Sequence, residues 1–250
     1  MLTPQQSAHF DTFGFAFFRQ AFSPLEMATI TSAAEEIWRS DEQEIEGEER
    51  RLGYFVERSQ PLTALVTDER IYPVITDLLG PDLLWICSEG NISNRSTVGW
   101  HPERKYYLSG EEHWMDFAQI KMMIYLDEID RNSGCLRVIP GSHRMPFHKS
   151  LALQEVDSGA QPFGVDGPDI PCVALTSQPG DIILFNHTLW HAPFGGGLQR
   201  RYIALKFAAW PTAAYHIESL EKYGTGVFEP HENFVNSDDV RIRDMVRVPP

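Results

Sequence analysis

The chain has 250 residues, of which 42% are hydrophobic and 22% charged, the balance of a globular protein with a sizeable core. Its 35 acidic and 21 basic side chains give a formal net charge of −14. That charge argues against nucleic-acid and anionic-membrane partners, because such surfaces need clustered lysine and arginine.

The cysteines and the N-terminus bear on where the protein works. Three scattered cysteines without a CxxC pair argue against a disulfide framework or a thiolate zinc site. The N-terminus lacks a signal-peptide pattern, and no apolar run reaches the roughly 18 residues of a membrane helix. We therefore expect a cytoplasmic protein, either a monomer or a homodimer.

The first 82 residues have the pattern of a mainly helical layer. Pro4, after a threonine, predicts a short helix that stops near Gly14, and the sequence FAFFRQ after it predicts an extended segment. Ser23, a following proline and Glu26 form a capping-box signature. Apolar residues at helical spacing follow it, so a longer helix is expected there.

Two weaker predictions complete this N-terminal part. The charged segment SDEQEIEGEERR, residues 40–51, is typical of a solvated loop. A further helix is expected over roughly 68–79, closed by Gly80, although Pro73 within it weakens that prediction.

From about residue 83 the sequence becomes typical of β-structure. Short apolar runs (LLWICS, QIKMMIYL, CLRVIP, CVALTS, DIILFN, RYIALKFAAW) alternate with clusters rich in Gly, Pro, Asn and Asp. Such a pattern predicts an antiparallel sandwich or barrel. No repeat or linker divides the chain, so one domain over 1–250 is expected, with the helical layer at 1–82, the β core at 83–210 and a C-terminal tail at 211–250.

A candidate metal site follows from histidine and glutamate spacing. His101 and Glu103 are two residues apart, so in an extended strand both side chains point to the same face. His187 and His191 come about ninety residues later, and a sandwich can bring either beside the first pair. Two imidazoles and one carboxylate suit Fe(II), with positions left open for a chelating co-substrate and O2. The spacing alone also fits a solvated loop pair at 101 and 103.

Three segments together resemble the phytanoyl-CoA dioxygenase family of 2-oxoglutarate-dependent oxygenases. They are FGFAFFRQAFSPLEMATITSAAEEI, then VGWHPE with KMMIYLDEIDRNSGCLRVIPGSHR, and finally QPGDIILFNHTLWHAPFGGGLQRRYIALKF. The resemblance spans roughly residues 10–210. It implies a double-stranded β-helix, or jelly-roll, core that uses Fe(II), 2-oxoglutarate and O2. The implied reaction hydroxylates a small-molecule substrate while 2-oxoglutarate is converted to succinate and CO2.

Position by position, the resemblance places the family's metal ligands on His101, Glu103 and His191. Glu103 stands where the family usually has aspartate. The family's co-substrate arginine falls on Arg200 or Arg201, and Arg200 is preferred because it matches the first arginine of the pair. A planar guanidinium suits the distal carboxylate of 2-oxoglutarate, which it can bind with two parallel hydrogen bonds.

Three further features are expected to lie near the site. Alternation along its strand turns Lys121 inward, where a basic group would help bind the co-substrate carboxylate; a solvent-facing lysine is the alternative. Asn91 precedes the metal strand, where relatives often place a polar side chain on the co-substrate; a plain turn asparagine is the alternative. The aromatic and charged insert 104–117 is expected at the substrate entrance.

Two other functions remain compatible with the same ligands. A cupin-like isomerase or binding protein can hold a metal with two histidines and a glutamate without consuming O2, but it has no need of an arginine nine residues after the last ligand. A catalytically silent binding module is expected if Glu103 does not ligate.

Overall fold

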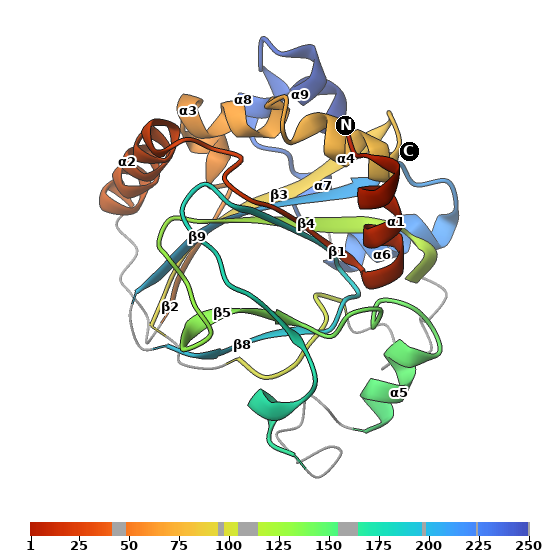
Figure 1. Ribbon diagram of the computed structural model, residues 1–250. Helices are drawn as coiled ribbons and strands as arrows, with labels where there is room; N and C mark the ends of the chain where they lie inside the picture. The colour runs from red at the N-terminus through yellow and green to blue at the C-terminus, as the bar shows by residue number, and fades with distance from the viewer. Residues whose placement is uncertain are drawn as a thin grey trace.

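The computed structural model describes residues 1–41, 49–94, 98–104, 115–154, 165–196, 199–223 and 225–249. Within these ranges the strands form two antiparallel sheets that face each other (Figure 1). The larger sheet contains, in spatial order, β1 (Phe15–Phe18), β7 (Ile182–Asn186), β4 (Gln119–Tyr125), β9 (Arg200–Ala209), β3 (Leu83–Ser93) and β2 (Glu49–Gly53). The smaller sheet contains β6 (Val173–Leu175), β5 (Ser133–Val138) and β8 (His191–Gly195).

Helices cover the outer face of the larger sheet. Figure 1 shows α2, α3, α4, α8 and α9 on the side of this sheet away from β5 and β8, and α5 beyond the smaller sheet. The α-helices are α1 (Pro4–Phe13), α2 (Pro24–Ser40), α3 (Gln60–Thr63), α4 (Tyr72–Leu79), α5 (Phe147–Leu153), α6 (Ala214–Tyr223), α7 (Thr225–Phe228), α8 (Glu232–Val235) and α9 (Val240–Met245). Short 3₁₀ turns lie at Val56–Arg58, Ala64–Thr67 and Gly167–Asp169. No helix in the described ranges is long and apolar enough to cross a membrane.

The local signals near the N-terminus are confirmed. The Thr3 hydroxyl accepts a hydrogen bond from the Gln6 amide and caps α1, which ends at Gly14 with a φ of 82°. Ser23 and Glu26 form the predicted capping box at the start of α2. These predictions depend only on hydrogen bonds within one helical turn, so the sequence alone was sufficient.

Two other N-terminal predictions are correct only in part: the helix closed by Gly80 is confirmed except for its start, and the predicted loop is wrong at its C-terminal end. Helix α4 begins at Tyr72 instead of residue 68, because Pro73 occupies its first turn, where the missing amide proton is not needed. Residues 49–53 of the predicted loop form β2, which pairs with β3 and buries Leu52. Residues 42–48 of that loop lie outside the described ranges.

Strict alternation divides the residues of the larger sheet between two cores. The outward residues of β4 (Ile120, Met122, Ile124) pack with buried residues of α2 in one apolar cluster. The inward Met123 and Tyr125 belong to a second cluster, together with Leu136 and Val138 of the smaller sheet. The inner face of the larger sheet therefore looks into the space between the sheets, and its polar side chains are confined there.

Candidate metal centre

Three of the predicted site residues meet between the sheets. His191 is the first residue of β8, and His101 pairs with it in an isolated antiparallel bridge, each backbone amide donating to the other residue's carbonyl at 3.0 Å. The Glu103 amide donates to the His187 carbonyl at 2.9 Å. We expected residues 101–103 to form an extended strand, but the structure has only the isolated bridge at His101. His101 and Glu103 converge because both are anchored to the segment 187–191.

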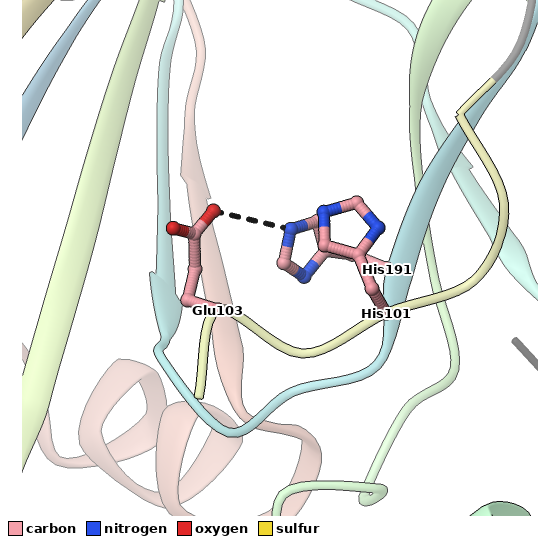
Figure 2. Close-up of side chains that lie close together, drawn as sticks. All are labelled: His101, Glu103 and His191. Atoms are coloured by element: carbon pink, nitrogen blue, oxygen red, sulfur yellow. Dashed lines mark ion pairs between the residues drawn. The ribbon is translucent and has the colours of Figure 1, made fainter. Parts of the chain in front are cut away.

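The side chains of these residues form a compact cluster. The candidate ligand atoms of His101, Glu103 and His191 lie within 4.8 Å of one another (Figure 2). Glu103 Oε1 is 3.4 Å from His191 Nε2, and the centroids of the two imidazole rings are 4.4 Å apart. We refer to these three residues as the triad.

Backbone carbonyls orient both imidazoles. His101 Nδ1 lies 2.7 Å from the Gly99 oxygen, and His191 Nδ1 lies 2.8 Å from the Leu189 oxygen. A carbonyl can only accept, so each Nδ1 carries a proton, which leaves Nε2 as the nitrogen of each ring that can ligate a cation. This second hydrogen bond is the usual way in which a metal-binding histidine is held.

Burial and charged neighbours favour the metal-binding protonation states of His101 and Glu103. Burial, with a further contribution from His191, lowers the pKa of His101 to about 4. Burial acts to raise the pKa of Glu103, but the Lys121 and Lys206 ammonium groups hold it well below its ordinary value. Lys121 Nζ lies 2.5 Å from Glu103 Oε1, and Lys206 Nζ lies 3.8 Å from Oε2. At neutral pH His101 is therefore neutral and Glu103 is a carboxylate, the forms that bind metals.

The lowered pKa of His101 predicts a pH effect on the metal-free protein. Between the ordinary pKa of 6.5 and the folded value of about 4, the unfolded chain binds a proton at this residue that the folded chain excludes. Stability is therefore lost as pH falls through that window. The free energy of unfolding can be measured with urea in the presence of a chelator at pH 7 and at pH 5. Its decrease from pH 7 to pH 5 should be smaller for His101→Gln than for the parent. An equal decrease in both proteins would contradict a lowered pKa of His101.

A cavity opens beside the triad, between the two sheets. Its lining includes all three triad residues and both charged and apolar side chains from the two sheets: Glu49, Arg51, Glu89, Val98, Pro102, Lys121, Met123, Tyr125, Leu136, Pro193, Arg200 and Tyr202. Lys121 thus faces the cavity instead of solvent, as alternation along β4 predicts.

The two adjacent arginines of β9 point to opposite faces. Arg200 is buried and lines the cavity, where its Nη1 donates to the Gly134 carbonyl at 2.9 Å. Its Nε has no hydrogen-bond partner among the described residues. Arg201 faces the helical layer, where it pairs with Asp127 and Glu35, both at 2.6 Å. Of these two arginines, Arg200 is the one that lines the cavity.

Asn91 occupies a buried position within β3, so the turn-asparagine alternative is wrong. Its register partners are Arg51 on β2 and Tyr202 on β9, which both line the cavity, so Asn91 belongs to the same face of the sheet. Neither polar atom of its side chain has a partner among the described residues. A buried amide without partners is costly, and Asn91 lies behind the residues that line the cavity.

Four charged residues at or beside the cavity were not anticipated from the sequence: Glu49, Arg51, Glu89 and Lys206. The position of two of them could have been predicted from strand alternation. Lys206 is six residues after Arg200 and Glu89 is two before Asn91, and even spacing along a strand places residues on the same face. His187 stays outside the triad, and its Nδ1 lies 3.2 Å from Gln119 Oε1. Residues 105–114 of the predicted entrance insert lie outside the described ranges.

The donor set fits Fe(II). It combines two imidazole nitrogens with one carboxylate and no sulfur, and all three residues line the cavity. This is the composition of the facial two-histidine, one-carboxylate sites of non-haem iron oxygenases.

Comparisons with known proteins agree with this chemistry. The family model "Phytanoyl-CoA dioxygenase (PhyH)" matches residues 10–195 of the chain. The peroxisomal phytanoyl-CoA dioxygenase of Rattus norvegicus is 28% identical over 106 residues, which are 38% of this chain and 30% of the rat protein. The similarity to that relative thus covers less than a third of its length.

Solved structures share the fold. HygX from Streptomyces hygroscopicus, with nickel and 2-oxoglutarate bound, superposes with a TM-score of 0.67 at 20% identity, covering 84% of this chain and 88% of HygX. EctD from S. alaskensis with bound Fe superposes with a TM-score of 0.62 at 25% identity, covering 83% of this chain and 77% of EctD. The two facing sheets are therefore the double-stranded β-helix that the sequence resemblance implies.

Proposed function

The chain belongs to the phytanoyl-CoA dioxygenase family of 2-oxoglutarate-dependent non-haem iron oxygenases, and we propose that it hydroxylates a small organic molecule. The observation that carries this proposal is the convergence of His101, Glu103 and His191 at the wall of a cavity that Arg200 also lines. A metal-dependent isomerase would need the triad but not the buried arginine.

The proposed roles follow from the contacts of each side chain. His101, Glu103 and His191 hold the iron, with the two imidazoles oriented by the carbonyls of Gly99 and Leu189. Arg200 binds the distal carboxylate of 2-oxoglutarate, because it is the cavity guanidinium that retains an unpartnered buried N–H. Its contact with the Gly134 carbonyl fixes the guanidinium plane before the co-substrate arrives.

Two further residues are proposed to contact the co-substrate. Asn91 has both a donor and an acceptor available on the inner face of the sheet. The Lys121 ammonium lies against Glu103, within the same wall of the cavity, and is therefore close to any carboxylate bound beside the metal. Its contact with Glu103 supports a second contribution, which is to hold that ligand in position.

The cofactors supply the oxidation chemistry, and the protein determines where on the substrate it acts. Iron, 2-oxoglutarate and O2 together supply the oxidation, with conversion of 2-oxoglutarate to succinate and CO2 coupled to hydroxylation of the substrate. The protein supplies orientation and a site shielded from bulk water between two sheets. A small organic substrate is supported by relatives: HygX is known with hygromycin B bound, and EctD with 2-oxoglutarate and 5-hydroxyectoine.

The proposal is tested in two measurements on the full chain. Anaerobic addition of Fe(II) and 2-oxoglutarate should produce a visible charge-transfer absorption, and exposure to air should yield succinate. Mass spectrometry of a metabolite extract should then reveal a compound that gains one oxygen only when both iron and 2-oxoglutarate are present. A protein that forms neither the absorption nor succinate is not an oxygenase of this class.

A further inference from the structure

A second charged group lies in the cavity, two strands away from Arg200. Arg51 projects from the edge strand β2, and its register partner on β3 is Asn91. Glu89 of β3 and Lys206 of β9 complete the group, and Arg51 and Glu89 both line the cavity. None of these three residues is proposed above as an iron ligand or as a contact of 2-oxoglutarate, and Lys206 also lies 3.8 Å from Glu103 Oε2.

The contacts within this group hold Arg51 at the cavity wall. Both Arg51 Nη2 and Lys206 Nζ donate to the same oxygen, Glu89 Oε1, with Lys206 at 2.6 Å. Burial acts to raise the pKa of Glu89, but Lys206, Lys121 and Arg51 lower it to about 2, so it is a carboxylate at neutral pH. Two cations share one carboxylate, which leaves a positive excess.

Exposure identifies which member of the group meets a ligand. The Glu89 and Lys206 side chains are 9% and 8% exposed, whereas that of Arg51 is 54% exposed. A guanidinium has five N–H donors, and its contact with Glu89 engages one end of the fork. An arginine fixed at one end and open at the other is well suited to bind a carboxylate or a phosphate.

The charge balance of the site with iron and 2-oxoglutarate bound also favours an anionic ligand. The described cavity wall and the Lys206 behind it carry four cations (Arg51, Lys121, Arg200, Lys206) and three carboxylates (Glu49, Glu89, Glu103). Iron adds two positive charges and 2-oxoglutarate removes two. One positive charge is therefore unmatched among the described residues.

Arg51 and Arg200 lie on different strands of the cavity wall. β3 separates β2 from β9, so the two backbones are about 10 Å apart at the usual strand spacing. Their positions also differ along the strands, because Arg51 is level with Tyr202 and Arg200 is level with Glu49. The Arg51 and Arg200 positions are therefore separate parts of the cavity wall.

We infer that Arg51 binds an anionic group of the substrate, held for that purpose by Glu89 and Lys206, and that the substrate is a small carboxylate or phosphate instead of a neutral acyl chain. This inference rests on the proposed function, since it specifies what is oxidised at the same site. The bound anion neutralises the unmatched charge and directs the rest of the molecule toward the triad.

The test uses the holoenzyme and defined probes. The full chain with Fe(II) and 2-oxoglutarate is titrated, without O2, with a panel of small monocarboxylic acids and sugar phosphates. Each acid is paired with its primary amide and each phosphate with the free sugar. Perturbation of the visible absorption reports binding near the metal. Acids or phosphates should perturb it, and their neutral counterparts should do so at least about tenfold more weakly.

Variants assign the effect to Arg51. Arg51→Met should weaken the response to the best probe by at least about tenfold, and Arg51→Lys, which keeps the charge without the fork, should lie between the two. Arg50→Met is the matched control, because Arg50 lies on the opposite face of β2 and donates to the Asp41 carbonyl at 2.6 Å.

The two hypotheses fail in different ways. If the visible absorption never forms, the proposed oxygenase function is wrong. If it forms but responds to no anionic probe, responds equally to neutral counterparts, or responds unchanged in Arg51→Met, the oxygenase stands and the anion site is wrong.

Discussion

Replacement of Glu103 by alanine is expected to abolish iron binding and 2-oxoglutarate-dependent succinate formation. The variant loses one of three ligands and also leaves the Lys121 and Lys206 ammonium groups facing the metal position without the carboxylate between them. Changes to residues that merely support metal ligands cost about 10–100-fold in affinity or activity, so loss of a ligand should exceed that range. Iron content after gel filtration and succinate formation measure the effect.

Two substitutions separate charge from shape at this position. Glu103→Gln keeps the volume and one acceptor but removes the negative charge, and it should lose iron as Glu103→Ala does. Glu103→Asp restores the residue usual in the family and should retain part of the activity. Thermal unfolding of each variant is needed as a control, because a buried lysine without its partner destabilises the fold. Iron binding at the parental level in Glu103→Gln would show that this side chain is not a ligand.

Local and long-range information contributed differently to the sequence predictions. The caps at Thr3 and Ser23 were predictable because they need only a few neighbouring residues. Strand β2 was not, because the charged sequence around Arg51 favours a loop until β3 pairs with it and Glu89 meets the guanidinium. Tertiary pairing outweighs local propensity in edge strands of this kind.

The same distinction applies to the site. The resemblance selected His101, Glu103 and His191, and these residues converge in the structure. The spacing argument relied on strand alternation, whereas hydrogen bonds to the backbone of residues 187–191 position His101 and Glu103. Lys206 and Glu89 escaped notice because their proximity to Glu103 and Arg51 depends on register across three strands, which the sequence does not display.

Replacement of Arg200 by methionine is expected to raise the KM for 2-oxoglutarate by about 30-fold or more, while iron binding persists. Truncating one partner of a buried, hydrogen-bonded charge pair costs at least about 2 kcal/mol, and each 1.4 kcal/mol corresponds to a factor of ten. Methionine preserves much of the volume beside Gly134, so the substitution mainly removes the donors. Steady-state succinate formation at varied 2-oxoglutarate concentration gives the KM.

Arg201 provides a matched control one residue away on the same strand. Its guanidinium pairs with Asp127 and Glu35 on the helical side of the sheet, so Arg201→Met removes partly exposed ion pairs worth at most about 1 kcal/mol each. It should lower the Tm slightly and leave the KM for 2-oxoglutarate unchanged. If Arg201→Met raised the KM and Arg200→Met did not, the co-substrate would have to bind away from the cavity beside the triad. Equal and small effects of both substitutions would instead assign the distal carboxylate to another cation of the cavity, with Lys121 the first to test, because its ammonium already lies against a triad carboxylate.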